Sequence, residues 1–123
     1  MNKKHITHGK LKVFMILFLA VILIVLVVVC AKKIKLSQNE KNIIGTWKNS
    51  NSENVITVQD SDTLILYKDI PEAGLYHGNA SYHFSYTDTI CVTQDDISAE
   101  FCVDVDENQL IIYFAGQVYL VLQ

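Results

Sequence analysis

The chain has no arginine, and its ten basic residues are all lysines, of which only Lys48 and Lys68 follow residue 41. Residues 42–123 hold these two lysines against twelve Asp and Glu residues, a formal net charge of −10 with histidine neutral. Such a domain is disfavoured as a nucleic-acid binder, because phosphate binding depends on clustered Lys and Arg. The same charge keeps it off an anionic lipid surface and favours either simple solubility or recognition of a basic partner.

No charged residue, proline or glycine interrupts the nineteen residues from Val13 to Ala31, and Lys12 and Lys32 close the run at its two ends. A helix of this length rises roughly 28 Å, close to the hydrocarbon thickness of a bilayer, about 30 Å. A soluble strand is typically ~5 to 6 residues long and would need turn residues, which the run lacks. The sequence therefore predicts one transmembrane helix over residues 13–31, with the lipid bilayer as its partner.

The flanks of this helix determine its predicted orientation. Four lysines and no acidic residue lie in a basic N-terminal tail, residues 1–12, as in a signal anchor. Residues 32–41 hold four more lysines, so only the free amino terminus decides for a cytoplasmic N-terminus. We expect a single-pass protein of the cell membrane, with a juxtamembrane linker or single helical turn over residues 32–41 and an extracytoplasmic domain over residues 42–123.

Cys30, at the outer end of the apolar run, leaves two alternatives open. A cysteine at this place resembles a bacterial lipoprotein signal, although three valines precede it where such signals carry a small residue. The segment Val29-Cys30-Ala31 also passes as a weak peptidase cleavage site. The retained helix is the prediction that we carry forward, with Cys30 as a small apolar residue.

Eight short strand-like segments follow, separated by turn-forming residues. They are Gly45–Ser50, Val55–Val58, Thr63–Lys68, Ala80–Tyr86, Thr89–Thr93, Ser98–Val105, Gln109–Phe114 and Gln117–Leu122. No segment with helical periodicity competes after residue 42. The expected fold is all-β, a small eight-stranded antiparallel meander that closes as a barrel or sandwich because so many strand edges must be paired.

Strands of this length rise only ~17 to 20 Å, which is too short for a deep ligand cup. The predicted core contains one tryptophan and three phenylalanines, Trp47, Phe84, Phe101 and Phe114. Side chains of this size suffice to fill an eight-stranded barrel. A filled interior favours recognition by the surface of the domain over transport of a small molecule.

The longest irregular stretch of the domain, residues 69–79, holds the only proline, Pro71, and two of the five glycines, Gly74 and Gly78. Loops of this kind often carry function. Pro71, Gly74, Tyr76 and His77 are therefore the candidate functional residues. No other pattern indicates catalysis, and we expect neither enzymatic activity nor a cofactor.

The two cysteines of the domain, Cys91 and Cys102, flank a predicted hairpin turn. If the numbers of paired residues sum to 193, the cysteines face each other on one side of the sheet and apolar residues face each other on the other. Directly opposed residues at a non-hydrogen-bonded site lie ~4.5 Å apart at Cα, which a disulfide tolerates. The sequence thus predicts a Cys91–Cys102 disulfide in an oxidising compartment. A metal site that combines these cysteines with His77 or His83 lacks the usual close ligand spacing.

Gly45-Thr46-Trp47 stands at the start of the first predicted strand. A glycine, any residue and then tryptophan at this place resembles the opening of lipocalin-type calycin barrels and of small bacterial envelope-associated domains of uncharacterised role. The resemblance implies a barrel, a structural role for Trp47 and binding of a small apolar ligand. In that family a basic residue of the last strand covers the tryptophan, whereas this chain has no lysine after Lys68.

Two functions follow as expectations. The first is a membrane-tethered module, inhibitor-like or immunity-like, that recognises a basic protein or a cationic envelope component by its acidic surface. The second, implied by the resemblance, is a lipocalin-like binder of a small apolar ligand. Lysine as the only basic residue besides histidine, together with many Asn and Ile residues, is typical of a low-GC bacterium.

Overall fold

The structure, a computed structural model, describes residues 2–60 and 62–123, and the side chains of its helix from Gly9 onward. The chain divides into two compact units, residues 1–34 and residues 35–123. The first unit belongs to α1 (Asn2–Asn42), whose part from Gly9 to Asn42 is long and apolar enough to cross a membrane. An 18-residue window within it has a mean hydropathy of 3.7. The apolar side chains of residues 13–29 are exposed, as a helix requires if its natural surroundings are lipid.

The segment over residues 32–41, expected as a linker or a single helical turn, is helical throughout, since α1 ends at Asn42. No glycine or proline stands between residues 32 and 42 to end the helix. Its last turns belong to the second unit, where Asn39 is only 2% exposed and its Nδ2 donates a hydrogen bond of 2.8 Å to the Thr87 carbonyl. Ile43, directly after the helix, is buried in the core. Tertiary contacts thus order a segment whose polar sequence indicates a linker.

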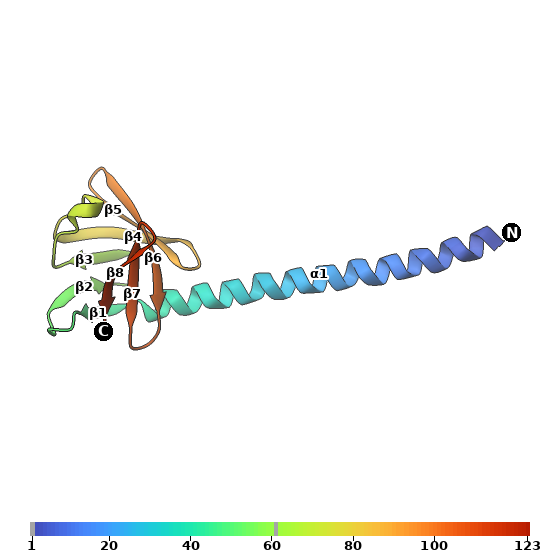
Figure 1. Cartoon of the computed structure of the whole chain (residues 1–123), viewed down its shortest axis with the longest axis horizontal. Helices are drawn as coiled ribbons and strands as arrows, with labels where there is room; N and C mark the ends of the chain where they lie inside the picture. The colour runs from blue at the N-terminus through green and yellow to red at the C-terminus, as the bar shows by residue number, and fades with distance from the viewer. Residues whose placement is uncertain (1, 61) are drawn as a thin grey trace. The chain divides into compact units, whose positions relative to one another are not determined.

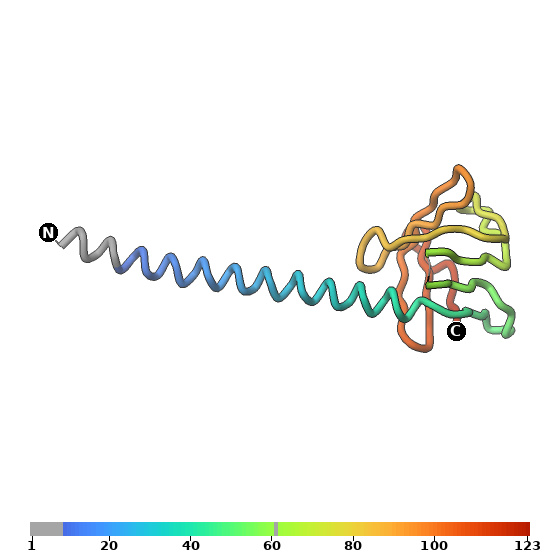
Figure 2. Tube along the Cα trace, turned by 180° about the vertical axis from the view of Figure 1, so that it is seen from behind, coloured from blue at the N-terminus to red at the C-terminus, as the bar shows by residue number. Residues whose placement is uncertain are grey.

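Eight strands follow α1 and pair in sequence order as one antiparallel sheet (Figures 1 and 2). They are β1 (Gly45–Lys48), β2 (Asn54–Val58), β3 (Thr63–Leu66), β4 (Gly78–Tyr86), β5 (Thr89–Gln94), β6 (Ile97–Val105), β7 (Leu110–Phe114) and β8 (Gln117–Leu122). The sheet curves into a nearly closed barrel, and the predicted all-β class with one N-terminal helix is confirmed. Closure comes from two reciprocal backbone hydrogen bonds of 2.8 Å between Lys48 and Gln123.

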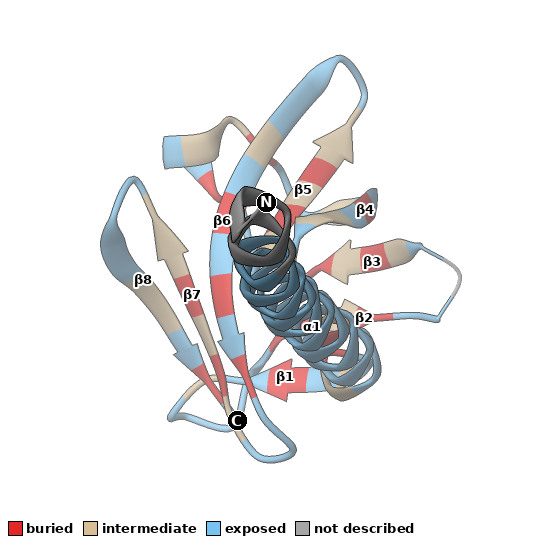
Figure 3. Cartoon of the chain, turned by 90° about the vertical axis from the view of Figure 1, so that its right-hand side faces the viewer, coloured by how far each residue is buried: buried red, intermediate tan, exposed pale blue. Residues whose placement is uncertain are grey.

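Buried and exposed residues alternate along most strands, so the inward side chains form one apolar core (Figure 3). Trp47 and Phe101 lie in this core, and Phe84 and Phe114 pack against it partly buried. The indole nitrogen of Trp47 donates a hydrogen bond of 2.8 Å to the Ile43 carbonyl. The tryptophan therefore ties the first strand to the end of α1.

The structure overturns the predicted pairing of β5 with β6. Cys91 lies opposite Glu100 and Cys102 lies opposite Thr89, so paired numbers sum to 191 instead of 193, and both thiols are free. A shift of two residues leaves every side chain on its own face of the sheet, so the pattern of apolar residues could not distinguish the two registers. The turn decides, because Asp95 adopts a positive φ of 52° and the chain reverses over Asp95 and Asp96 alone. The predicted disulfide was wrong for this reason.

Candidate functional site

The loop between β3 and β4 is anchored in the barrel by its own apolar side chains. Leu75 is fully buried, Ile70 is nearly so, and the backbones of these two residues exchange hydrogen bonds of 2.8 and 3.0 Å. Pro71 begins the short 3-10 helix η1 (Pro71–Ala73), and Gly74 ends it with a φ of 74° that favours glycine. Pro71 and Gly74 thus shape a compact loop whose inner side closes over the core.

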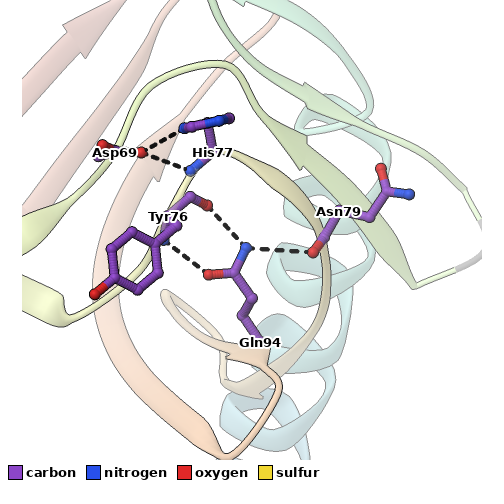
Figure 4. A network of polar contacts seen from close by, with 5 residues as sticks. All are labelled: Asp69, Tyr76, His77, Asn79 and Gln94. Atoms are coloured by element: carbon purple, nitrogen blue, oxygen red, sulfur yellow. Dashed lines mark hydrogen bonds and ion pairs between the residues drawn. The ribbon is translucent and has the colours of Figure 1, made fainter.

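The outer side of this loop is held by polar contacts (Figure 4). The side-chain amide of Gln94, at the end of β5, accepts a hydrogen bond from the Tyr76 amide and donates one to the Tyr76 carbonyl, both 2.8 Å long. One carboxylate oxygen of Asp69 accepts from the His77 amide at 2.9 Å and lies 2.7 Å from Nδ1 of the His77 ring. Hydrogen bonds from the backbone and then from the ring of His77 hold the pKa of Asp69 below its ordinary value.

The four residues predicted in this loop therefore divide into two pairs. Pro71 and Gly74 fix the backbone, whereas Tyr76 is 64% exposed and His77 is more exposed still. Both exposed rings are available to a partner. One carboxylate oxygen of Asp69 contacts both the amide and the ring of His77, so this pair links the start of the loop to its end.

A groove that no sequence pattern indicated lies beside this loop, where the barrel is incompletely closed. Strand β1 has only four residues, and among the described backbone hydrogen bonds only those of the Lys48–Gln123 pair join it to the end of β8. The two strands diverge beyond this pair (Figure 3). The opening holds a hollow of about 200 Å³. Apolar side chains and a few polar groups line it, namely Asn49, Val55, Ile56, Leu66, Lys68, Asp69, Ile70, Tyr119 and Leu120.

One hydrogen bond bounds this opening at the end away from the Lys48–Gln123 pair. The hydroxyl of Tyr119 on β8 donates to a carboxylate oxygen of Glu72 in η1 at 2.6 Å. This bond, followed by burial and the charge of Glu72, raises the pKa of Tyr119 to about 12. The same bond, followed by one from the backbone of Glu72 itself, lowers the pKa of Glu72. We call the opening between the Lys48–Gln123 pair and the Tyr119–Glu72 bond the seam groove.

Chemically, the seam groove suits an apolar side chain beside a basic group. Its floor is aliphatic, and Asp69 and Glu72 stand at its edge. Lys68 is the one basic residue of its lining, and the Nζ atom of Lys68 lies 3.4 Å from a carboxylate oxygen of Glu53. The groove was missed because its lining comes from four separate segments and because its existence depends on where β1 ends.

A second hollow, of about 390 Å³, lies where the end of α1 meets the barrel within the second unit. It is lined by Ser37, Glu40, Lys41, Ile44, Asp60, Asp62, Tyr82, His83 and Phe84. Burial and then the nearby carboxylates of Asp62, Glu40 and Asp60 raise the pKa of Tyr82. His83 points outward from β4 and is exposed.

Side chains of the metal-binding types are not clustered in the described part of the chain. There, no group of three or more His, Cys, Asp and Glu side chains is placed to hold a metal ion. The site with the most developed geometry is therefore the β3–β4 loop with the adjoining seam groove. We found no match for this chain among protein families, curated proteins or solved structures, so this geometry is the basis for any assignment of function.

Proposed function

We propose that the protein is a membrane-anchored binding module, whose barrel lies outside the cytoplasm and recognises a basic protein or a cationic envelope component. Residues 13–31 would hold it in the bilayer as a single pass with the N-terminus inside. An inhibitor or an immunity-like protein is one form that such a module takes. The observation that carries the proposal is the charge of residues 42–123, −10 with histidine neutral.

The placement of the two lysines strengthens this charge argument. Lys68 is paired with Glu53, which leaves Lys48 as the basic residue of the barrel without an ion pair among the described residues. Most of the carboxylates stand in turns and on outward faces, and among the described residues only Glu53 and Asp69 lie within ion-pair distance of a basic side chain. Charges exposed in this way steer a basic partner and raise its association rate, more strongly at low salt.

The interior of the barrel favours recognition by the surface over the lipocalin-like alternative. The core retains a void of about 20 Å³, lined by apolar residues, which is the volume for about one water molecule. A pocket for a small ligand typically measures ~300 to 1,000 Å³. The seam groove, at about 200 Å³, has room for one or two side chains rather than for a whole apolar ligand. The hollow of about 390 Å³ beside the end of α1 is large enough for a small ligand, but most of the side chains that line it are polar or charged.

The proposal is tested by crosslinking the full chain to its neighbours in intact cells. A variant with Asp95→Asn, Glu100→Gln and Asp104→Asn removes three exposed carboxylates, and Asn suits the positive φ at residue 95. We expect the captured partners to be basic and their yield to fall both in this variant and at high salt. A control with Ser98→Ala and Gln117→Ala should leave the yield unchanged.

Two results would contradict the proposal. One is capture that neither the charge variant nor added salt reduces. The other is a small apolar molecule that stays bound to the full chain in native mass spectrometry, which would favour the lipocalin-like alternative.

A further inference from the structure

The edge of β8 at the seam groove has the geometry of a docking strand. We propose that the partner binds there with an extended segment in which basic and apolar residues alternate, and that this segment pairs with β8 as an added strand. This inference rests on the proposed function, because it names the place and the conformation in which a basic partner is recognised. Such strand addition combines backbone hydrogen bonds for affinity with a pocket for alternate side chains.

The backbone of β8 presents unpaired groups toward the opening. Gln123 directs its N–H and C=O to Lys48, and successive residues of a strand direct these groups to opposite sides. Leu122 therefore bonds to Leu110 on β7, and Val121 directs its N–H and C=O away from β7, as Gln123 does. Among the described backbone hydrogen bonds, none joins Val121 to β1 or to the β1–β2 turn.

The short length of β1 explains why this edge is open. After Lys48 the chain leaves the barrel wall, since the Asn49 amide bonds to the Glu53 carbonyl at 3.0 Å and the Asn49 side chain accepts from the Asn51 amide. A strand that continued would pair with Val121, whose backbone makes no hydrogen bond to β1 or to the β1–β2 turn among those described. A free edge of this kind is a template for another chain.

The seam groove supplies the side-chain pocket next to this edge. Leu120 and Tyr119 of β8 line it on one side, and Val55, Leu66 and Ile70 line it on the other. Its volume of about 200 Å³ suits one or two aliphatic side chains of an added strand. Every second residue of that strand would point into the groove, and the residues between would point to solvent.

The acidic residues beside the groove favour a basic partner segment over a second copy of this chain. Asp69 and Glu72 flank the groove, and Lys68 is already paired with Glu53, so this side of the rim attracts cations. Lys48, at the end where β1 meets β8, is the one lysine of the barrel without an ion pair among the described residues. A second copy of this chain would bring another barrel of charge −10 against the first, which opposes pairing of two β8 edges. A basic extended segment gains from the same field.

The test is amide hydrogen exchange, measured by NMR on the full chain in detergent micelles. The probe is a synthetic peptide of alternating lysine and valine, about eight residues long, which is enough to cover one strand. One control peptide replaces lysine by glutamate. Another keeps the lysines but carries N-methyl groups on alternate residues, so that it retains the charge and loses the backbone donors.

We expect the Val121 amide to exchange freely without peptide and about tenfold or more slowly with the lysine–valine peptide. The amides of Leu120 and Leu122, which face β7, should be protected in both states and serve as internal controls. The N-methylated peptide should bind more weakly, and the glutamate peptide should not bind. Glu72→Gln, which keeps an acceptor for Tyr119, should weaken binding by roughly threefold, and Glu107→Gln in the β6–β7 turn should weaken it less.

The outcomes separate this inference from the proposed function. Salt-sensitive binding of the lysine–valine peptide without slower exchange at Val121 would overturn the docking strand and leave recognition by an acidic surface standing. No preference for the lysine peptide over the glutamate peptide would overturn both. Protection of Val121 that rises with protein concentration and without peptide would show that a second copy occupies the edge, and the inference would be wrong.

Discussion

At the residue scale, the bond between Tyr119 and Glu72 shows how a partly buried ring and an exposed carboxylate join the two sides of the barrel near its opening. The two residues are 47 positions apart in the sequence, and they join the last strand to the β3–β4 loop. The bond favours neutral tyrosine and ionised carboxylate, so the pKa of Tyr119 rises to about 12 and that of Glu72 falls. Its contribution to stability is therefore fully present between the ordinary values of 4.5 for Glu72 and 10.0 for Tyr119.

Titration of tyrosine absorbance checks this prediction. We expect a phase at about 12 that disappears in Tyr119→Phe and moves toward 10.0 in Glu72→Leu. The stabilising contribution should be lost as pH falls through the lowered pKa of Glu72, and also as pH rises through that of Tyr119. Tyr76→Phe is the matched control, since its ring is exposed and outside this bond, and it should leave the phase at about 12 in place. Persistence of that phase in Tyr119→Phe would show that the assignment is wrong.

At the element scale, the β3–β4 loop behaves as part of the core rather than as a flexible connection. Leu75 is fully buried, and replacing it by alanine leaves a cavity that the barrel cannot close. We expect Leu75→Ala to lower the free energy of unfolding by about 2 to 5 kcal/mol. Val118→Ala, at an exposed site of β8, should change it by less than about 0.5 kcal/mol. Urea unfolding of the full chain in detergent, followed by the fluorescence of Trp47, measures both, and equal effects would contradict an anchored loop.

The β5–β6 hairpin offers a second test at this scale. Gln94 and Ile97 flank a two-residue turn, so hydrogen-bonded and non-hydrogen-bonded pairs alternate from there, and Cys91 with Glu100 is a non-hydrogen-bonded pair. In a Cys30→Ser and Cys102→Ser background, Glu100→Cys should therefore form a disulfide with Cys91 on mild oxidation. The natural pair Cys91 and Cys102 should stay reduced under the same conditions. Mass spectrometry of the oxidised chains identifies which cysteines are linked. A disulfide between Cys91 and Cys102, with none between Cys91 and the cysteine at residue 100, would support the register predicted from the sequence.

At the scale of the whole molecule, the free thiols offer a test of the proposed topology. Cys102 is exposed, and Cys91 is partly exposed. In a Cys30→Ser variant, we expect a membrane-impermeant maleimide to label the barrel on intact cells without any reductant. A Cys30→Ser and Cys102→Ser variant is the control, which should lose most of the labelling. Labelling that needs permeabilised cells would place the barrel in the cytoplasm.

Some features of this protein follow from its sequence alone because their physical cause is local. The length of an uninterrupted apolar run is enough to indicate a membrane-spanning helix. Apolar and polar residues that alternate one by one between turn-forming residues are enough to indicate strands. The boundaries of the last strand, Gln117–Leu122, match the prediction, and β2 and β5 differ from it by a single residue. The division into a lysine-rich N-terminal part and an acidic domain can likewise be read directly from the sequence.

Other features were decided only by the tertiary structure, because they depend on contacts between distant residues. The pairing of Cys91 with Glu100, and not with Cys102, follows from the conformation of one turn. Both pairings leave each side chain on the same face of the sheet, so the apolar pattern does not distinguish them. Residues 32–41, whose composition left a linker or a single helical turn open, form the last turns of α1, and Asn39 bonds there to the Thr87 carbonyl. The seam groove exists because β1 ends at Lys48, opposite Gln123, so the earlier residues of β8 have no strand beside them. How far the first strand accompanies the last one depends on how the barrel closes, which the sequence of neither strand reveals.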